Sequence, residues 1–226
     1  MGEIQTAILQ GVGDHEIRVI TRLSNTTPSE KALVVFPGYR YPPDAPAIFY
    51  AQLAFLKHGW DVVAFDYRYN ELPGFLSQGE EKADEQIRDE AIEMGKYIRE
   101  HFPANTLCIL GKSLGTTVVH HIVQHVDLQT VGTSVILLTP TEFQRELVEI
   151  VIQTGRTGFV AIGEKDPYYR KDVVEEQSGN PRIQWETIQD AGHLFEDVGR
   201  DMGRSLDNVK RVTEAIEKKI SDGWFG

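Results

Sequence analysis

Residues 106–116, TLCILGKSLGT, decide the fold, because a short apolar run leads directly into the pattern Gly-x-Ser-x-Gly. The run from Thr106 to Leu110 predicts a buried strand, and the stretch from Thr116 to Val126 predicts a helix. A serine between two glycines at such a junction occupies a tight, strained turn in which flanking side chains would collide with neighbouring backbone. The motif therefore predicts that Ser113 is presented as a nucleophile.

The helix after Ser113 would point its first backbone amides and the positive end of its dipole at the serine. Such a group stabilises the negative oxygen that develops during acyl transfer. A structural alternative is that Ser113 only caps the helix. The strand, turn and helix around the motif favour the nucleophile over the cap.

Apolar runs alternate with segments of helical period along most of the chain. Continuous runs such as Ala32 to Phe36 are typical of strands buried on both faces, as in a parallel sheet covered by helices. Two earlier strands, 4–9 and 17–23, are separated by a glycine-containing turn and predict an antiparallel pair at one edge. The remaining predicted strands are 61–65, 106–110, 134–138, 159–162 and 182–188.

We therefore expect an α/β protein with a mostly parallel, twisted sheet of about seven to eight strands and helices on both faces. Apolar residues at helical spacing predict two of the covering helices, one around 87–98 and one around 209–220. No internal repeat, low-complexity tract or linker divides the chain, so residues 1–226 are expected to form a single domain.

The composition argues against several classes of partner. The net charge of -11 and the pI of about 5.1 disfavour nucleic acid and anionic lipid surfaces, which require clustered cationic residues. The sequence shows neither a membrane span nor a signal peptide, and Cys108 is the single cysteine. We expect a cytoplasmic protein that acts on a small molecule and needs no cofactor.

The elbow around Ser113 and the order of the elements resemble the α/β-hydrolase family from about Leu33 to the end of the last helix. The resemblance implies a catalytic acid after a later strand and a histidine after the final strand, in the order Ser, Asp, His. Asp166 in GEKDP (163–167) and His193 in DAGHLF (190–195) stand at those places. Glu164 is the nearest rival acid, and Asp166 could also serve as a turn or cap residue before a helix that begins at Pro167.

The resemblance also assigns roles. His193 would take the proton of Ser113 and return it to the leaving group, while Asp166 would orient the imidazole and stabilise its cation. The oxyanion hole would combine the backbone amides of Leu114 and Tyr39. Here the chain departs from the family's common His-Gly form and has Pro-Gly at positions 37–38, so the resemblance does not fix the geometry of this loop.

Aromatic and basic residues gather in the loops expected at the carboxyl ends of the strands, where such sheets bind ligands. They could line an acyl pocket or hold an anionic group of the substrate. The aromatic residues could equally be ordinary packing at the rim, and the basic ones could pair with nearby carboxylates. The candidates are Arg40, Tyr67, Arg68, Lys112, Tyr168 and Phe195.

Two further features bear on the site. His121 and His125 have a spacing that could bind a metal, but no third ligand is suggested, so no metal site is expected. The segment between Leu138 and Phe159 holds about one helix, 142–152, so no large cap domain is expected. The loop 66–82 would then be the only flap over an open site suited to short or medium substrates.

Three functions remain open from the sequence. The first is hydrolysis of small or medium carboxylic esters or thioesters through an acyl-Ser113 intermediate. The second uses the same three residues for peptide cleavage, acyl transfer or hydrolysis of a carbon–carbon bond. The third is a hydrolase-like module that binds a ligand without catalysis.

Overall fold

Eight strands form one sheet in the computed structural model, which describes residues 3–25, 28–102, 104–126, 128, 133–141 and 144–226. Their order is β1-β2-β4-β3-β5-β6-β7-β8, with parallel pairing from β4 to β8 and antiparallel pairing of β2 with β1 and β4. The mostly parallel sheet and the antiparallel edge confirm the sequence predictions. The strands are β1 (Ile4–Gln10), β2 (Glu16–Arg22), β3 (Lys31–Phe36), β4 (Asp61–Asp66), β5 (Thr106–Lys112), β6 (Thr133–Leu138), β7 (Thr157–Gly163) and β8 (Ile183–Ile188).

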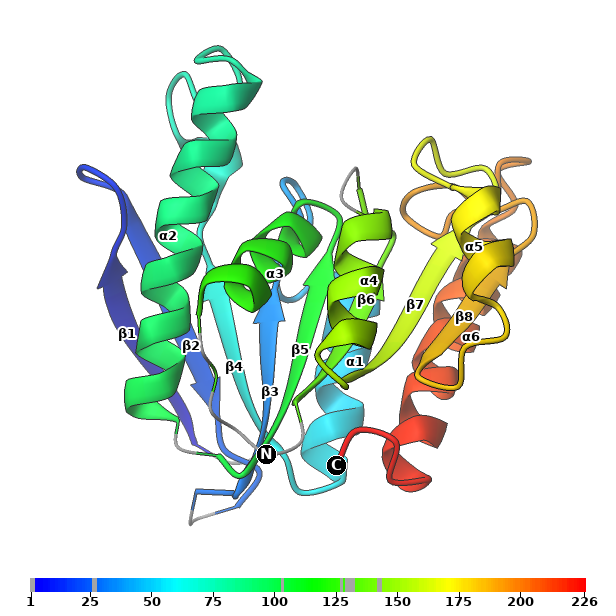
Figure 1. Ribbon diagram of the computed structural model, residues 1–226, viewed down its shortest axis with the longest axis horizontal. Helices are drawn as coiled ribbons and strands as arrows, with labels where there is room; N and C mark the ends of the chain where they lie inside the picture. Colours follow the sequence, from blue (N-terminus) through cyan, green and yellow to red (C-terminus); the bar gives the residue numbers. More distant parts are fainter. Residues whose placement is uncertain (1–2, 26–27, 103, 127, 129–132, 142–143) are drawn as a thin grey trace.

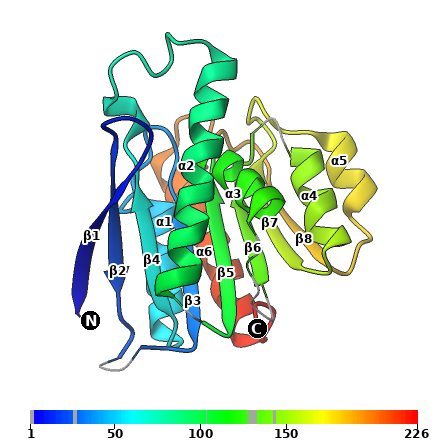
Figure 2. The ribbon, with the colours of Figure 1, turned by 60° about the vertical axis from the view of Figure 1, so that its left-hand side comes forward.

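Helices cover both faces of the sheet (Figures 1 and 2). On one face lie α1 (Pro46–Lys57) and α6 (Met202–Ser221), which contact each other. On the other lie α2 (Glu80–His101), α3 (Leu114–His125) and α4 (Gln144–Gln153), with α5 (Lys171–Gln177) joined to α4 by ion pairs of Arg145. The predicted start of α4 at Glu142 lies outside the described residues.

Pro167 does not begin a helix, contrary to one sequence interpretation. It lies in the turn after β7, and α5 begins four residues later, at Lys171. The residues between belong to the turn that carries Asp166, whose backbone amide donates to the Gly163 carbonyl oxygen at 3.1 Å. The aspartate is therefore a turn residue rather than a helix cap.

Alternate residues of the central strands enter two separate hydrophobic clusters. In β3, Leu33 and Val35 pack on the side of α1 and α6, whereas Val34 and Phe36 pack on the side of α2 and α3. All four are fully buried. Burial on both faces explains why the sequence shows continuous apolar runs instead of alternation.

The carboxyl ends of β3, β5, β7 and β8 meet at one edge of the sheet, at the top of Figure 1. In register, Phe36 lies beside Gly111 and Gly163 lies beside Ile188. The loops that follow these strands therefore emerge on the same side. Three of them carry Ser113, Asp166 and His193.

A buried ion pair fastens the β1–β2 hairpin to α2. His15 Nδ1 lies 2.8 Å from Glu90 Oε1, and His15 Nε2 lies 2.6 Å from the carbonyl oxygen of Tyr67. Burial alone would lower the pKa of His15, but the hydrogen bond and charge of Glu90 outweigh it and raise that pKa above 6.5. Burial opposes ionisation of Glu90 too, yet the hydrogen bond from His15 leaves the Glu90 pKa below 4.5. The pair thus also anchors the chain just after β4.

Replacing Glu90 by Gln should lower the free energy of unfolding by about 3 kcal/mol, because a buried charge loses its partner. The raised pKa of His15 contributes stability that is lost as pH rises above 6.5, and the lowered pKa of Glu90 contributes stability that is lost as pH falls below 4.5. Denaturant unfolding of both proteins should therefore show the largest difference between these two values. Glu93→Gln, at an exposed site of the same helix, is the control, and a Glu90→Gln deficit that is constant with pH would contradict the interpretation.

The helix α3 approaches β3 so closely that only glycine fits at position 115. A Cβ atom there would overlap the carbonyl oxygen of Phe36. This contact places the start of α3, and with it Ser113, against the end of β3.

Gly115→Ala should cost about 2 kcal/mol or more in stability, since the neighbouring atoms belong to the backbone and cannot turn aside. Thermal unfolding measures the loss. Gly179→Ala is the matched control, because a Cβ at Gly179 meets nothing within 4 Å, and its effect should stay within about 0.5 kcal/mol. Equal melting temperatures for the two variants would show that the contact is not tight.

Candidate active site

Ser113 lies between β5 and α3 in a backbone conformation that few residues other than glycine adopt, with φ 52° and ψ -120°. Two backbone hydrogen bonds hold the turn: the Ser113 amide donates to the Leu138 carbonyl oxygen at 2.9 Å, and the Thr116 amide donates to the Ser113 carbonyl oxygen at 2.8 Å. A Cβ at Gly111 would lie 2.7 Å from the carbonyl oxygen of Gly115. The glycines of the motif are therefore required by crowding.

Ser113, His193 and Asp166 form a continuous chain of hydrogen bonds. His193 Nε2 lies 2.7 Å from Ser113 Oγ, and His193 Nδ1 lies 2.8 Å from Asp166 Oδ2. Because a carboxylate only accepts, Nδ1 is the donor to Asp166, which leaves Nε2 as acceptor for the serine hydroxyl. The Asp166 side chain is completely buried, whereas the His193 ring is 26% exposed.

The turn after β7 distinguishes the two candidate acids. The Asp166 side chain points inward, and its second oxygen, Oδ1, accepts from the Tyr168 amide at 2.9 Å. Glu164 is exposed, and its backbone amide donates to the Ile188 carbonyl oxygen at 2.9 Å. Asp166 is therefore the acid that meets the histidine.

The loop that carries His193 is fixed from both sides. The Lys165 amide donates to the Ala191 carbonyl oxygen at 3.0 Å, and a Cβ at Gly163 would overlap that same oxygen. Phe195 is fully buried among the residues of the α1–α6 cluster, and its carbonyl oxygen accepts from Asn208 of α6 at 3.0 Å. These contacts determine where the imidazole stands.

The two amides expected to form an oxyanion hole lie in segments that flank Ser113. Leu114 is the first residue of α3, and Tyr39 follows Gly38, at which a Cβ would lie 3.4 Å from the Cβ of Ser113. Within the described residues, neither amide donates to a protein acceptor. Both donors remain available to a bound group.

A cavity of about 540 Å³ opens beside Ser113. Phe75, from the loop after β4, stacks on Tyr39 and on Tyr69, with ring centroids 6.1 and 4.6 Å apart. Phe75 is only 3% exposed, so this part of the predicted flap is anchored in the protein. The cavity is lined by Tyr39, Phe75, Leu76, Glu80, Glu81, Ala83, Asp84, Ile87, Ser113, Leu114, Thr117, Thr141 and Tyr168.

Tyr168 is the predicted pocket residue that the structure places in this cavity, with its ring 5.7 Å from that of His193. Tyr67 and Phe195 do not line it, contrary to expectation. Both are buried in the core, and the Tyr67 hydroxyl donates to the carbonyl oxygen of Pro37. They support the loops of the site from behind.

The basic candidates are also absent from the lining of this cavity. Arg40 and Arg68 line a different cavity of about 670 Å³, between β2 and the loops after β3 and β4. There Arg68 pairs with Asp66 at 3.0 Å. Lys112 is completely buried and extends into the protein interior.

The acidic side of the Ser113 cavity was not anticipated. Glu80, Glu81 and Asp84 are its charged lining residues among those described. A pair of acidic residues such as 80–81 is more often a solvated helix start than part of a site. Their place in the chain is the one feature of the sequence that points to the site. These residues lie in the first turns of α2, and α2 directly follows the loop that the sequence predicted as a flap.

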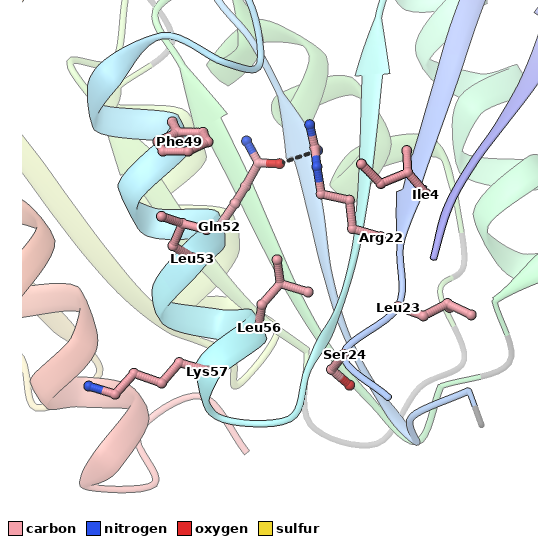
Figure 3. A pocket seen from close by; sticks show the side chains of 9 residues that line it. All are labelled: Ile4, Arg22, Leu23, Ser24, Phe49, Gln52, Leu53, Leu56 and Lys57. Carbon is pink, nitrogen blue, oxygen red and sulfur yellow. Dashed lines mark hydrogen bonds between the residues drawn. The ribbon is translucent and has the colours of Figure 1, made fainter. Parts of the chain in front are cut away.

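An apolar cavity of about 280 Å³ lies away from Ser113, between β1, β2 and α1 (Figure 3). Figure 3 shows Gln52 of α1 and Arg22 of β2 pointing toward one another, joined by a hydrogen bond of 2.7 Å. The lining brings no nucleophile and base together. It comprises Ile4, Arg22, Leu23, Ser24, Phe49, Gln52, Leu53, Leu56 and Lys57.

A histidine of α3 pairs with a carboxylate of α2. His121 Nε2 lies 3.0 Å from Asp84 Oδ1, and the His121 and His125 rings stack with centroids 6.1 Å apart. Across the residues that the structure describes, no three His, Cys, Asp or Glu side chains are grouped to hold a metal ion. In the same residues, every helix is too short or too polar to cross a membrane.

Comparisons with solved structures show the same fold. A serine hydrolase without a lid from Xanthomonas campestris matches with a TM-score of 0.65 and 16% identity, covering 96% of this chain and 94% of the other. An esterase from Pyrococcus furiosus matches with a TM-score of 0.62 and 16% identity, covering 96% of this chain and 93% of the other. Est1E from Butyrivibrio proteoclasticus matches with a TM-score of 0.69 and 11% identity, covering 96% of this chain and 98% of the other. No curated protein matches the sequence.

The family comparison covers most of the chain. Residues 31–221 match the model described as an alpha/beta hydrolase domain. This range begins with β3 and ends with α6, so it contains the elbow and both later loops. β6 ends at Leu138 and the described part of α4 begins at Gln144, so the chain has no room for a cap domain at that point. The protein belongs to the α/β-hydrolase family and has the lidless form of its fold.

Proposed function

We propose that this protein is a serine hydrolase that cleaves small or medium carboxylic esters or thioesters through an acyl-Ser113 intermediate. The observation that carries the proposal is the pair of hydrogen bonds, 2.7 and 2.8 Å, that links Ser113 Oγ through His193 to Asp166. This geometry is the one in which a histidine acts as base toward a serine while a buried carboxylate fixes its tautomer.

In the first half of the reaction, Ser113 Oγ attacks the carbonyl carbon while its proton passes to His193 Nε2. The same proton then passes to the departing alcohol or thiol, which leaves the acyl group on Ser113. Water attacks that acyl group in the second half, with His193 again accepting and returning a proton. Asp166 stays ionised and stabilises the imidazolium in both halves.

The amides of Leu114 and Tyr39 are the proposed oxyanion donors. Their support is that both flank Ser113 and that neither is used by another acceptor among the described residues. Each donor of this kind is worth about a hundredfold or more in rate.

The cavity supports a preference for uncharged substrates of modest size. Its volume is about 540 Å³, and its exposed Leu76 offers an apolar surface for an acyl chain. Glu80, Glu81 and Asp84 would repel a substrate that carries a carboxylate. The proposed substrate is therefore a neutral acyl compound.

A fluorophosphonate probe should label Ser113, since the probe reacts with serines whose hydroxyl is activated by a base. Intact mass and the labelled peptide identify the site. Ser113→Ala should abolish labelling, and His193→Ala should reduce it by about a thousandfold or more. Asp166→Asn should reduce it strongly while leaving the fold intact.

Ser178→Ala, far along the chain in an exposed turn, is the matched control and should label like the parent protein. Folded protein that remains unlabelled would refute the proposal and favour a ligand-binding module. Labelling that persists in Ser113→Ala would place the nucleophile elsewhere.

Among p-nitrophenyl esters, the butyrate should have a higher kcat/KM than both the palmitate and the hemisuccinate. The described lining offers only Leu76, Ile87 and Leu114 as large aliphatic side chains to cover a palmitoyl chain, and the hemisuccinate brings a carboxylate toward three acidic side chains. The triple variant Glu80→Gln, Glu81→Gln, Asp84→Asn should narrow the gap between butyrate and hemisuccinate and leave butyrate hydrolysis nearly unchanged. A parent enzyme that prefers the palmitate or the hemisuccinate would contradict this substrate class.

A further inference from the structure

Lys112 occupies the variable position before the serine in the Gly-x-Ser-x-Gly motif, yet its side chain is completely buried. A lysine is almost never fully buried unless its amine is paired, because removing the charge from water is costly. The buried amine of Lys112 therefore needs hydrogen-bond or charge partners. Since the Ser113 cavity does not include Lys112 in its lining, those partners belong to the protein itself.

Three groups surround the amine. Lys112 Nζ donates to Thr139 Oγ1 at 2.6 Å and to the carbonyl oxygen of His193 at 3.1 Å. The face of the Tyr41 ring lies below it, with 4.9 Å between Nζ and the ring centroid. Three donor directions of an ammonium group therefore meet a hydroxyl, a carbonyl and an aromatic face.

The partners come from loops that build the site. Tyr41 closes the loop after β3, where the Gly38 amide donates to the Tyr41 carbonyl oxygen at 3.0 Å. Thr139 follows β6 in a left-handed conformation with φ 44°, and its amide donates to the Ala161 carbonyl oxygen at 2.7 Å. His193 is the proposed base. One amine thus joins the elbow to three neighbouring loops.

We propose that Lys112 is a positioning residue whose ammonium group holds the backbone carbonyl of His193, so that the imidazole stays aligned with Ser113. The proposal rests on the proposed function of Ser113 and His193. Lys112 contacts no reacting atom. It acts through the main chain of the residue that does.

Charge is part of this arrangement. Burial lowers the pKa of Lys112 to about 7, opposed by the carboxylates of Asp166 and Glu196. The Tyr41 ring is the other titratable group in contact with the amine, whereas His193 offers it only a backbone carbonyl oxygen. A neutral amine gives weaker hydrogen bonds and loses the attraction to the ring. The hold on the His193 loop should therefore loosen as pH rises through neutrality.

The stability effect of the same titration has the opposite sign. Between about 7 and 10.5 the amine is neutral in the folded protein but charged in the unfolded chain. The unfolded state then binds more protons, so stability relative to a variant without the amine rises with pH across this window. As pH rises, the alignment of His193 should therefore weaken while the stability of the fold increases. A merely structural role of Lys112 would affect stability alone, so the two roles can be told apart.

The test compares the full-length parent protein with Lys112→Met, which keeps the length of the side chain but removes the donors. We expect fluorophosphonate labelling of Ser113 to slow about ten- to a hundredfold at pH 6.5, since small displacements of a catalytic group have effects of this size. The ratio of the parent rate to the variant rate should fall as pH rises above 7. The imidazole resonances of His193 in NMR spectra should shift and broaden in the variant.

Thr139→Val and Thr139→Ser provide the matched pair, because valine removes the hydroxyl acceptor while serine retains it. Valine should slow labelling in the same direction as Lys112→Met, and serine should restore the parent rate. Melting temperatures show whether each variant folds. If Lys112→Met does not fold, the labelling rates of Thr139→Val and Thr139→Ser are compared instead.

The NMR measurement keeps this inference separable from the proposed function. If the parent protein is not labelled but Lys112→Met still displaces the His193 resonances, the positioning role stands and the proposed hydrolase activity fails. If the parent is labelled at Ser113 while Lys112→Met leaves the rate, its pH profile and the His193 resonances unchanged, the positioning role is wrong and the hydrolase proposal survives.

Discussion

The close contact between the end of β3 and the start of α3 is the constraint on which the site depends. Gly115 lies against the Phe36 carbonyl, and Gly111 lies against Gly115. These contacts restrict the backbone conformation of the residues between the two glycines. Ser113 at the apex is held at φ 52°. Strain at one residue is tolerated because the surrounding buried strands cannot move aside.

The same sheet edge supplies the other two members of the hydrogen-bonded chain. β7 and β8 are neighbours, and the turns that follow them contact each other through Lys165 and Ala191. Asp166 and His193 therefore meet without any long connecting segment. Buried residues behind the loops, such as Phe195, contribute to the site by fixing the backbone from which these side chains extend.

Apolar runs in the sequence predicted the strands, and the resemblance to the α/β-hydrolase family implied that Asp166 and His193 would be the partners of Ser113. Continuous apolar runs identify buried parallel strands, and strand ends identify the edge where loops converge. Which loop side chains turn inward does not follow in this way. Tyr67 and Phe195 occupy the core because of contacts with residues far along the chain: the Tyr67 hydroxyl donates to the Pro37 carbonyl oxygen, and the Phe195 carbonyl oxygen accepts from Asn208 of α6.

Lys112 illustrates the same limit most clearly. Its place beside the serine suggests a substrate ligand, but strand alternation directs its side chain inward, where Thr139, Tyr41 and His193 receive the amine. Those partners lie on three other loops. Only the assembled sheet edge brings them together, so a pattern in one segment of sequence could not reveal them.

The proposed role of Ser113, as a nucleophile that faces two backbone donors, can be tested by a crystal structure of the phosphonylated protein. We expect a covalent bond from Ser113 Oγ to phosphorus, with one phosphonyl oxygen about 2.7–3.1 Å from the amide nitrogens of Leu114 and Tyr39. A phosphonyl group attached elsewhere, or attached to Ser113 with no oxygen near either amide, would contradict it.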